Sequence, residues 1–147
     1  MSRSALYESD FHAWAKEQAA LLRAGKLMQA DIDRIAEEID SMGRTEKREL
    51  VSRLTILLLH LLKWRFQPTL RGRSWRLSVE GQRLDVESHL ADNPSLKAAL
   101  EAAIAQAYRR AAIDAQRETG LDAAVFPVAC PWSFDQIMDP GFWPDAE

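Results

Sequence analysis

A short apolar run inside a long helical pattern constrains this chain more than any other feature. The segment Thr45–Gln67 has the periodicity of one long helix, and its centre, Ile56–Leu62, is apolar almost all round. A helix with such a centre has to be covered by other helices on every side. The sequence therefore predicts a helical bundle built around this segment. Pro68 is the expected end of the helix, because proline cannot continue it.

The rest of the chain supplies the helices that would cover the centre. Apolar residues recur at spacings of three and four in further segments that end at turn residues. These segments are Tyr7–Arg23, Asp31–Met42, Ser74–Leu90 and Ser95–Thr119. Ser9 and Ser74 are the expected N-caps of the first and third. Only Gly43 and Arg44 separate the second segment from Thr45, so we expect a tight antiparallel hairpin there, with Thr45 as N-cap.

The final segment, residues 121–147, is rich in proline yet too apolar for a disordered end. Its aromatic residues are Phe126, Trp132, Phe134, Phe142 and Trp143. Ser133 and Gln136 form a capping box for one helical turn, and we expect the tail to strap across the bundle. The predicted fold is one all-α domain over residues 1–147, a bundle of about five mostly antiparallel helices with a Pro- and aromatic-rich C-terminal strap.

Composition predicts a soluble, cytoplasmic protein. One cysteine, Cys130, allows no internal disulfide, which fits a reducing compartment. The N-terminal residues have no apolar core of signal-peptide length. The longest apolar run is about a third of the roughly 20 residues that a membrane span needs, so no membrane association is expected.

Charge is unevenly distributed along the chain. Residues 44–83 hold ten Lys/Arg and three Asp/Glu, a net charge of +7, whereas the remaining residues hold nine and nineteen, a net charge of −10. Such asymmetry within one domain indicates either an anionic partner or the internal pairing of opposite charges.

The basic stretch Lys63–Arg76, KWRFQPTLRGRSWR, interleaves cations with aromatic rings. Its candidate nucleic-acid- or anion-binding residues are Lys63, Arg65, Arg71, Arg73 and Arg76. Arginine planes and aromatic rings together suit phosphates and unstacked bases. The competing interpretation is that the rings belong to the core and that the cations pair internally, with the acids of Asp31–Met42, or bind an acidic protein partner. We favour this second interpretation, because many helical proteins carry a comparable density of bases.

No metal or cofactor is predicted. A di-iron bundle needs Glu-x-x-His motifs, and no glutamate stands three residues before His12, His60 or His89. Cys130 has no CxxC partner for zinc. His60 is expected to be a core histidine bonded to a backbone or side-chain acceptor. A looser site that joins His60 to Glu37 or Glu38 is disfavoured by the register of the hairpin.

The remaining polar groups are expected to be structural. His89 and Asp85 form an i, i+4 pair, interpreted as a surface ion pair; a general base is the alternative, but no nucleophile accompanies it. Cys130 has no base close in sequence that would lower its pKa. Ion pairs across the hairpin, or alternatively a polar pocket at its end, are expected from Glu37, Glu38, Arg44, Lys47 and Arg48.

Several motifs resemble, in order and over nearly the whole chain, the bacterial family called domain of unknown function 29. The motifs are YxxDFxxW from Tyr7, LLRAGK from Leu21, IAEEIDSMGRTEKRELVSRL from Ile35, LLLHLLKWRFQP from Leu57, DNPSLK from Asp92, ETGL from Glu118, FPxxCPW from Phe126 and DPGFWP near the end. The resemblance implies a small helical cytoplasmic protein with no established activity. It supplies no catalytic residue. The pair Ile35-Ala36 departs mildly from the expected Leu-Ile.

From these observations we expect a non-enzymatic interaction module that binds a protein partner or a second copy of itself. The first alternative is a nucleic-acid-binding protein that uses Lys63–Arg76. The second is a small metal-dependent or hydrolytic enzyme that uses His60 or His89.

Overall fold

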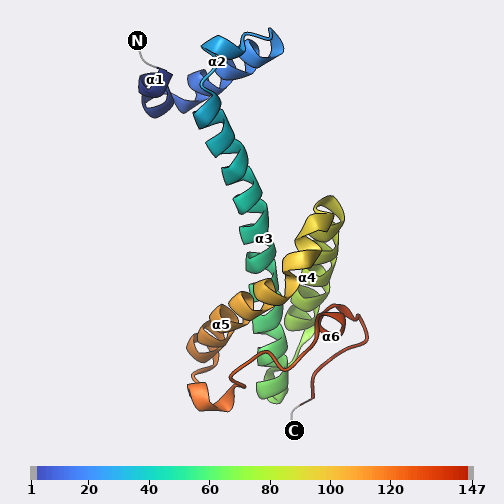
Figure 1. Cartoon of the computed structure of the whole chain (residues 1–147). Coiled ribbons are helices and arrows are strands. Elements are labelled where there is room, and N and C mark those ends of the chain that lie inside the picture. Colours follow the sequence, from blue (N-terminus) through green and yellow to red (C-terminus); the bar gives the residue numbers. More distant parts are fainter. Residues whose placement is uncertain (1–2, 146–147) are drawn as a thin grey trace. The chain divides into compact units, whose positions relative to one another are not determined.

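The protein is built from helices throughout the part that the structure describes. The computed structural model describes residues 3–145, and these contain no strand. The α-helices are α1 (Arg3–Ser9), α2 (Phe11–Arg23), α3 (Ile32–Phe66), α4 (Arg73–Asp92), α5 (Leu100–Thr119) and α6 (Phe134–Met138) (Figure 1). Short 3₁₀ turns lie at Leu27–Gln29, Pro68–Leu70, Pro94–Ala99 and Ala123–Val125. The predicted all-α class is confirmed. No helix in residues 3–145 combines the length and apolar character that crossing a bilayer requires.

The chain divides into two compact units, residues 1–45 and residues 46–147. They are called here the N-terminal unit and the C-terminal unit. The single domain predicted over residues 1–147 stays a prediction.

In the N-terminal unit, the predicted helix Tyr7–Arg23 is wrong in its start and in its cap. The chain forms α1 and α2 instead, separated at Asp10. Asp10, not Ser9, is the N-cap of α2, because its carboxylate accepts a hydrogen bond of 3.0 Å from the backbone N–H of Ala13. Packing between rings supports the break, since Tyr7 of α1 lies 4.8 Å, centroid to centroid, from Trp14 of α2.

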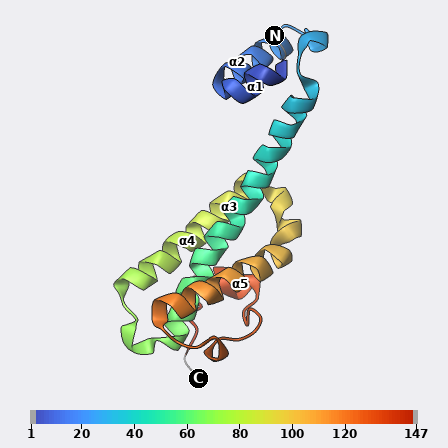
Figure 2. The same ribbon diagram turned by 90° about the vertical axis from the view of Figure 1, so that its left-hand side faces the viewer.

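The core of the C-terminal unit forms along the second half of α3. The fully buried leucines are Leu50, Leu54, Leu57, Leu58, Leu61 and Leu62. They pack with Val79 and Val86 of α4 and with a face of α5 made largely of alanine, beside α3 in Figures 1 and 2. Ile56 departs from the predicted all-round cover, because its side chain stays 41% exposed. The remaining helices therefore cover most, but not all, of this segment.

The predicted strap is confirmed. Trp132 and Ile137 of the tail are buried in the core of the C-terminal unit, and Ser133 and Gln136 form the expected capping box at the start of α6. Arg83 of α4 holds the tail in place, because its guanidinium donates to the backbone oxygens of Ile137 at 2.8 Å and Phe142 at 2.7 Å. Figure 1 shows the tail crossing beside α4.

The predicted hairpin at Gly43 and Arg44 is wrong, because α3 runs through both residues. Gly43 does not adopt a positive φ, unlike Gly25 and Gly120. Thr45 is no N-cap, since its hydroxyl donates to the carbonyl of Ser41 at 2.9 Å, one turn earlier. A glycine in a helix interior costs only about 1 kcal/mol against alanine. Good helix formers on both sides offset that cost, so the ladder of backbone hydrogen bonds continues.

Two other predicted boundaries shift for local reasons. Helix α4 begins at Arg73 with Gly72 as its N-cap, so Ser74 is inside the helix rather than its cap. The segment after Pro94 starts as a 3₁₀ turn and becomes α-helical at Leu100. The predicted end at Gly120 is confirmed, because Gly120 has φ +74°, a left-handed conformation that glycine adopts without strain.

Candidate interaction surfaces

In the basic stretch, Lys63 and Arg71 are bound inside the C-terminal unit. The ammonium of Lys63 lies 3.0 Å from a carboxylate oxygen of Glu118 and 5.0 Å from the centroid of the Trp75 ring. Arg71 donates to the backbone oxygens of Trp64 at 2.7 Å and Pro144 at 3.1 Å. Both cations therefore fasten α3 and its following loop to other elements of the unit.

The other three predicted binding residues lie in different surroundings. Arg65 is half-buried over the ring of Phe66, and its Nε has no hydrogen-bond partner among the described residues. Arg76 pairs with Glu80 at 3.4 Å on the surface of α4. Arg73 is exposed at the start of α4.

The aromatic rings of the stretch pack against other parts of the C-terminal unit. Trp64 lies 4.5 Å from Trp143, and Phe66 lies 5.2 Å from Phe126, both centroid to centroid. These contacts are those of core and strap residues, as the competing interpretation expects. The assignment of the five bases to nucleic-acid binding stays a prediction.

His60 and His89 each bind a backbone carbonyl. His60 is half-buried with Nδ1 2.8 Å from the oxygen of Ile56, which confirms a backbone partner. The predicted His89–Asp85 pair is wrong, because both residues have other partners. His89 Nε2 lies 2.8 Å from the carbonyl of Glu46, whereas Asp85 pairs with Arg53 at 3.1 Å. Partners on the adjacent α3 offer better geometry than the next turn of α4. No group of three His, Cys, Asp or Glu within residues 3–145 is arranged to hold a metal ion.

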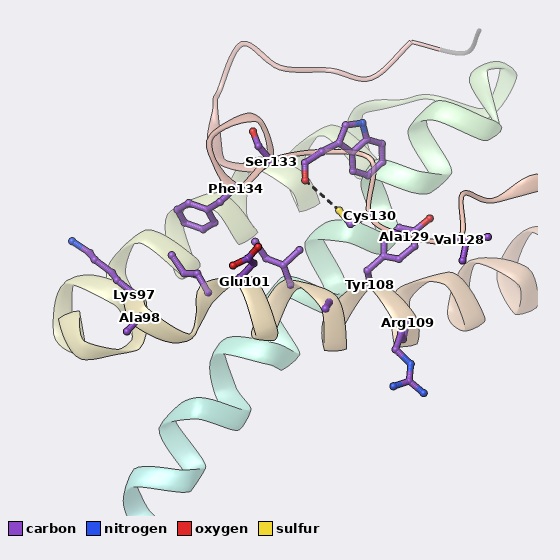
Figure 3. A pocket seen from close by; sticks show the side chains of 14 residues that line it. Lys97, Ala98, Glu101, Tyr108, Arg109, Val128, Ala129, Cys130, Ser133 and Phe134 are labelled. Atoms are coloured by element: carbon purple, nitrogen blue, oxygen red, sulfur yellow. Dashed lines mark hydrogen bonds between the residues drawn. The ribbon is translucent and has the colours of Figure 1, made fainter.

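A cleft of about 850 Å³ lies between α5 and the tail. Apolar side chains such as Ile104, Val128 and Phe134 line most of it, and Figure 3 shows that the labelled residues come from α5, from the turn Pro94–Ala99 before it and from the tail. Cys130 also lines the cleft and donates to the backbone oxygen of Trp132 at 3.5 Å. Burial raises the pKa of the Cys130 thiol, so the reactive thiolate is scarce at neutral pH. The cleft therefore suits the binding of an apolar group better than nucleophilic chemistry.

The N-terminal unit carries a row of apolar side chains on α3 that we call the uncovered stripe: Ile32, Ile35, Ile39 and Met42. The spacing of three and four residues places all four on one face of the helix. Ile32, Ile39 and Met42 are 49%, 63% and 69% exposed, and Ile35 is half-buried. The sequence marked this row as the buried face of a hairpin helix. Without the hairpin, that face has lost its expected cover.

One flank of the uncovered stripe is contacted by Tyr7 of α1. The hydroxyl of Tyr7 donates to a carboxylate oxygen of Glu38, and the guanidinium of Arg34 lies 4.6 Å from the centroid of the Tyr7 ring. The bond to Glu38 raises the pKa of Tyr7. On the face of α3 opposite the stripe, Arg44 pairs with Glu37 at 3.1 Å along the helix rather than across a hairpin, and both side chains are more than half exposed. Sequence reasoning found the stripe itself but could not find its exposure.

Comparison with known proteins identifies a family. A family model described as "Domain of unknown function DUF29" matches residues 6–143, nearly the whole chain, and confirms the resemblance seen in the motifs. No curated protein and no solved structure matches.

Proposed function

The chain belongs to the DUF29 family of domains of unknown function, and we propose that it is a non-enzymatic protein-interaction module that binds through the uncovered stripe. The observation that carries the proposal is the exposure of Ile32, Ile39 and Met42 in one row on α3. Isolated apolar side chains on a surface are common, whereas a contiguous apolar patch marks an interaction site.

The energy available from the stripe suits a specific but reversible contact. Burying one large apolar side chain yields roughly 1.5–3 kcal/mol. The three exposed side chains therefore supply several kcal/mol, from which the loss of translational and side-chain freedom is subtracted. An amphipathic helix of the partner would cover the stripe, because its own apolar side chains recur at the same helical spacing and can pack along the row.

Contacts elsewhere in the molecule support a role without catalysis. His60 and His89 lie against backbone oxygens, and burial keeps the Cys130 thiol protonated. The Glu46 carboxylate also lies 3.6 Å from Nε2 of His89, but the backbone partners of His60 and Cys130 activate neither group for acid–base or nucleophilic work. We propose a cytoplasmic location, since a lone cysteine fits a reducing compartment.

Nucleic-acid binding through Lys63–Arg76 ranks second. Lys63 and Arg71 are engaged inside the C-terminal unit, which leaves Arg73 and Arg76 as its most exposed cations. Binding through the phosphate backbone must weaken steeply with salt. Titration of labelled RNA and DNA at two salt concentrations, with an Arg73→Ala/Arg76→Ala variant, tests this alternative.

The proposal is tested with two aspartate substitutions at comparably exposed apolar sites. Ile39→Asp places a charge in the uncovered stripe, and Ile113→Asp places one on α5, where Ile113 is 52% exposed. Purified protein is examined by sedimentation velocity and by pull-down from an extract of its own source cells. We expect Ile39→Asp to abolish self-association or the capture of a partner and Ile113→Asp to leave it unchanged. Equal behaviour of the two variants, or a wild-type protein that binds nothing, would overturn the proposal.

A further inference from the structure

We propose that the outer face of α4 is a self-association surface, on which α4 of a second copy packs antiparallel about a two-fold axis. Spacings of three and four residues place five residues on that face, which we call the α4 seam: Ser74, Leu77, Gly81, Leu84 and Ser88. Val79 and Val86, on the opposite side of the helix, are buried in the core of the C-terminal unit. Figure 2 shows α4 at the edge of that unit, with α3 and α5 on its inner side. The seam is separate from the uncovered stripe, so this inference goes beyond the proposed function.

The α4 seam alternates exposed leucines with small residues. Leu77 and Leu84 are 46% and 67% exposed. A Cβ added to Gly81, which lies between them, would meet no atom within 4 Å. Leucines seven residues apart are spaced as in a helix that packs along a second helix, and small residues between them let its backbone approach closely. The single chain leaves this place open.

Opposite charges border the seam on one flank. Arg73 stands four residues before Leu77 and Glu87 three residues after Leu84, so each lies within about 60° of the nearer leucine round the helix. Fourteen residues are close to four helical turns, so Arg73 and Glu87 lie on the same flank. Both side chains are exposed, and neither forms an ion pair with any residue that the structure describes. This flank is therefore basic at its N-terminal end and acidic at its C-terminal end.

An antiparallel second copy matches the side-chain sizes along the seam. With the two-fold axis at the height of residue 79, Leu77 and Gly81 are equally distant from the axis, and so are Leu84 and Ser74. Leu77 then faces Gly81 of the second copy, and Leu84 faces its Ser74. Each leucine meets a small residue, which lets the two surfaces interdigitate. Every contact occurs twice, as in an isologous interface.

The same register joins the free charges. Each flank of one copy meets the identical flank of the other in an antiparallel pair, so Arg73 approaches Glu87. The two residues stand six and eight residues from the axis, a stagger of about 3 Å at 1.5 Å per residue. Both side chains lean toward the N-terminus of their own helix, which reduces the stagger. Two ion pairs between copies result.

Other arrangements of two α4 helices oppose like charges, which destabilise an interface. A parallel pair would bring Glu80 toward Asp85, and Glu87 toward Asp92. An antiparallel pair moved by seven residues would bring Glu80 toward Glu87. In the proposed register Glu80 lies beside the axis, where Arg76 of the same chain, 3.4 Å away, counters its charge. We choose a second copy as the partner because its own sequence supplies the matching sizes and charges by symmetry.

Cross-linking through single cysteines tests the direction of the pair. In a Cys130→Ser background, Ser74→Cys and Leu84→Cys should form a disulfide when the two variants are mixed and oxidised. Neither should cross-link alone, because its two copies would lie about 15 Å apart along an antiparallel pair at 1.5 Å per residue, beyond the reach of a disulfide. Cross-linking of each variant alone would show a parallel pair and overturn the inference.

A charge exchange tests the ion pairs by sedimentation equilibrium of the full chain. Glu87→Arg should weaken dimerisation by at least about tenfold, because it opposes two guanidinium groups at both ends of the interface. The double variant Arg73→Glu/Glu87→Arg restores opposite charges and should recover most of the affinity. Glu17→Arg, the same reversal at an exposed site on α2, should change nothing. A double exchange that dimerises no better than Glu87→Arg refutes the antiparallel contact.

Gly81→Gln separates dimerisation from folding. The added side chain has open space in the single chain and replaces glycine with a better helix former, so thermal unfolding of the monomer should occur at the same or a higher temperature. In the pair it occupies the place of Leu77 of the second copy and should weaken dimerisation by at least about tenfold. A Gly81→Gln variant that dimerises like the wild-type protein overturns the close approach of the two helices.

The outcomes also separate this inference from the proposed function. With self-association assigned to the α4 seam, the uncovered stripe is left for another protein. Ile39→Asp should then abolish capture of that protein and leave the dimer intact, whereas Glu87→Arg should do the reverse. A wild-type chain that stays monomeric at submillimolar concentration, or a dimer lost in Ile39→Asp and unchanged in Glu87→Arg, overturns the α4 pair.

Discussion

The two halves of α3 carry the same apolar periodicity, but the apolar face of one half is buried and that of the other is exposed. In the half that belongs to the C-terminal unit, Leu50, Leu54 and Leu57 are fully buried. In the half that belongs to the N-terminal unit, Ile39 and Met42 keep about two thirds of their surface exposed. Periodicity determines which face of a helix is apolar. Whether that face is covered depends on elements that arrive from elsewhere in the chain, or from another molecule.

The largest difference between the halves should appear on truncation of one side chain in each. Leu58→Ala removes a fully buried side chain and should lower the free energy of unfolding by roughly 2–5 kcal/mol. Ile39→Ala removes a largely exposed one and should change it by no more than about 0.5 kcal/mol. Urea unfolding at high dilution, where no second copy is bound, measures both. Similar losses at the two sites would show that the N-terminal half is covered within the single chain.

The next effect concerns Arg83, the buried cation that fastens the tail in the C-terminal unit. The guanidinium of Arg83 donates hydrogen bonds to the backbone oxygens of Ile137 and Phe142. Burial lowers the pKa of Arg83. Arg83→Met leaves both carbonyls without their donor and should cost roughly 1.5–3 kcal/mol. Arg53→Met, which breaks partly exposed pairs with Glu49 and Asp85, should cost less than about 1 kcal/mol.

Denaturant unfolding gives the two free energies for this comparison. Hydrogen exchange of the amides in residues 134–142 then shows whether the tail itself has loosened. If Arg83→Met leaves those amides as protected as in the wild-type protein, the tail is held by its buried aromatic side chains and not by the guanidinium.

The pH dependence of stability should reveal Tyr108, the buried tyrosine of the C-terminal unit. Burial raises the pKa of Tyr108 to about 12, whereas an unfolded tyrosine titrates near 10. The stabilisation from keeping this phenol neutral is complete below about pH 10 and is lost as the pH rises from there toward 12. Tyr108→Phe should therefore flatten the fall in the free energy of unfolding above pH 10. Urea unfolding at a series of alkaline pH values measures the slope, and an unchanged slope in Tyr108→Phe would contradict the assignment.

The smallest predicted change in stability is that caused by alanine at Gly43 or at Gly120. A Cβ added to Gly43 of α3 would meet no atom within 4 Å, so Gly43→Ala should stabilise the helix by roughly 0.5–1 kcal/mol. Gly120→Ala forces a side chain into the left-handed conformation at φ +74° and should destabilise by about 1–2 kcal/mol. Thermal unfolding compares the two. A loss of stability in Gly43→Ala would indicate that α3 bends or opens at that residue.

Short-range features of the fold were accessible from the sequence. The end of α5 at Gly120 and the capping box of Ser133 and Gln136 depend on residues within one helical turn, and both are as predicted. The hairpin failed because a glycine between two apolar rows fits equally a turn and a helix interior. The choice depends on whether something packs against the first row, which no local pattern reports.

For the candidate interaction surfaces too, the sequence showed the local patterns but not the distant contact partners. The apolar row from Ile32 to Met42 was visible as a pattern, and so was the basic stretch from Lys63 to Arg76. The partners of Lys63 and Arg71 were not, because Glu118 and Pro144 lie far away in sequence. The contact of Arg83 with the backbone of the tail could not be predicted for the same reason, because Ile137 and Phe142 also lie far from it in sequence.

The sequence by itself determined the helical class, the apolar faces, the helix ends before Pro68 and at Gly120, and membership of the DUF29 family. These properties follow from side chains that act over one or two helical turns, or from motifs read in order. Only the tertiary structure decided that α3 is continuous, that the second half of its apolar face is buried and the first half exposed, and which cations are bound internally. Those outcomes depend on contacts between distant segments, whose free energies are comparable to the cost of a single glycine in a helix.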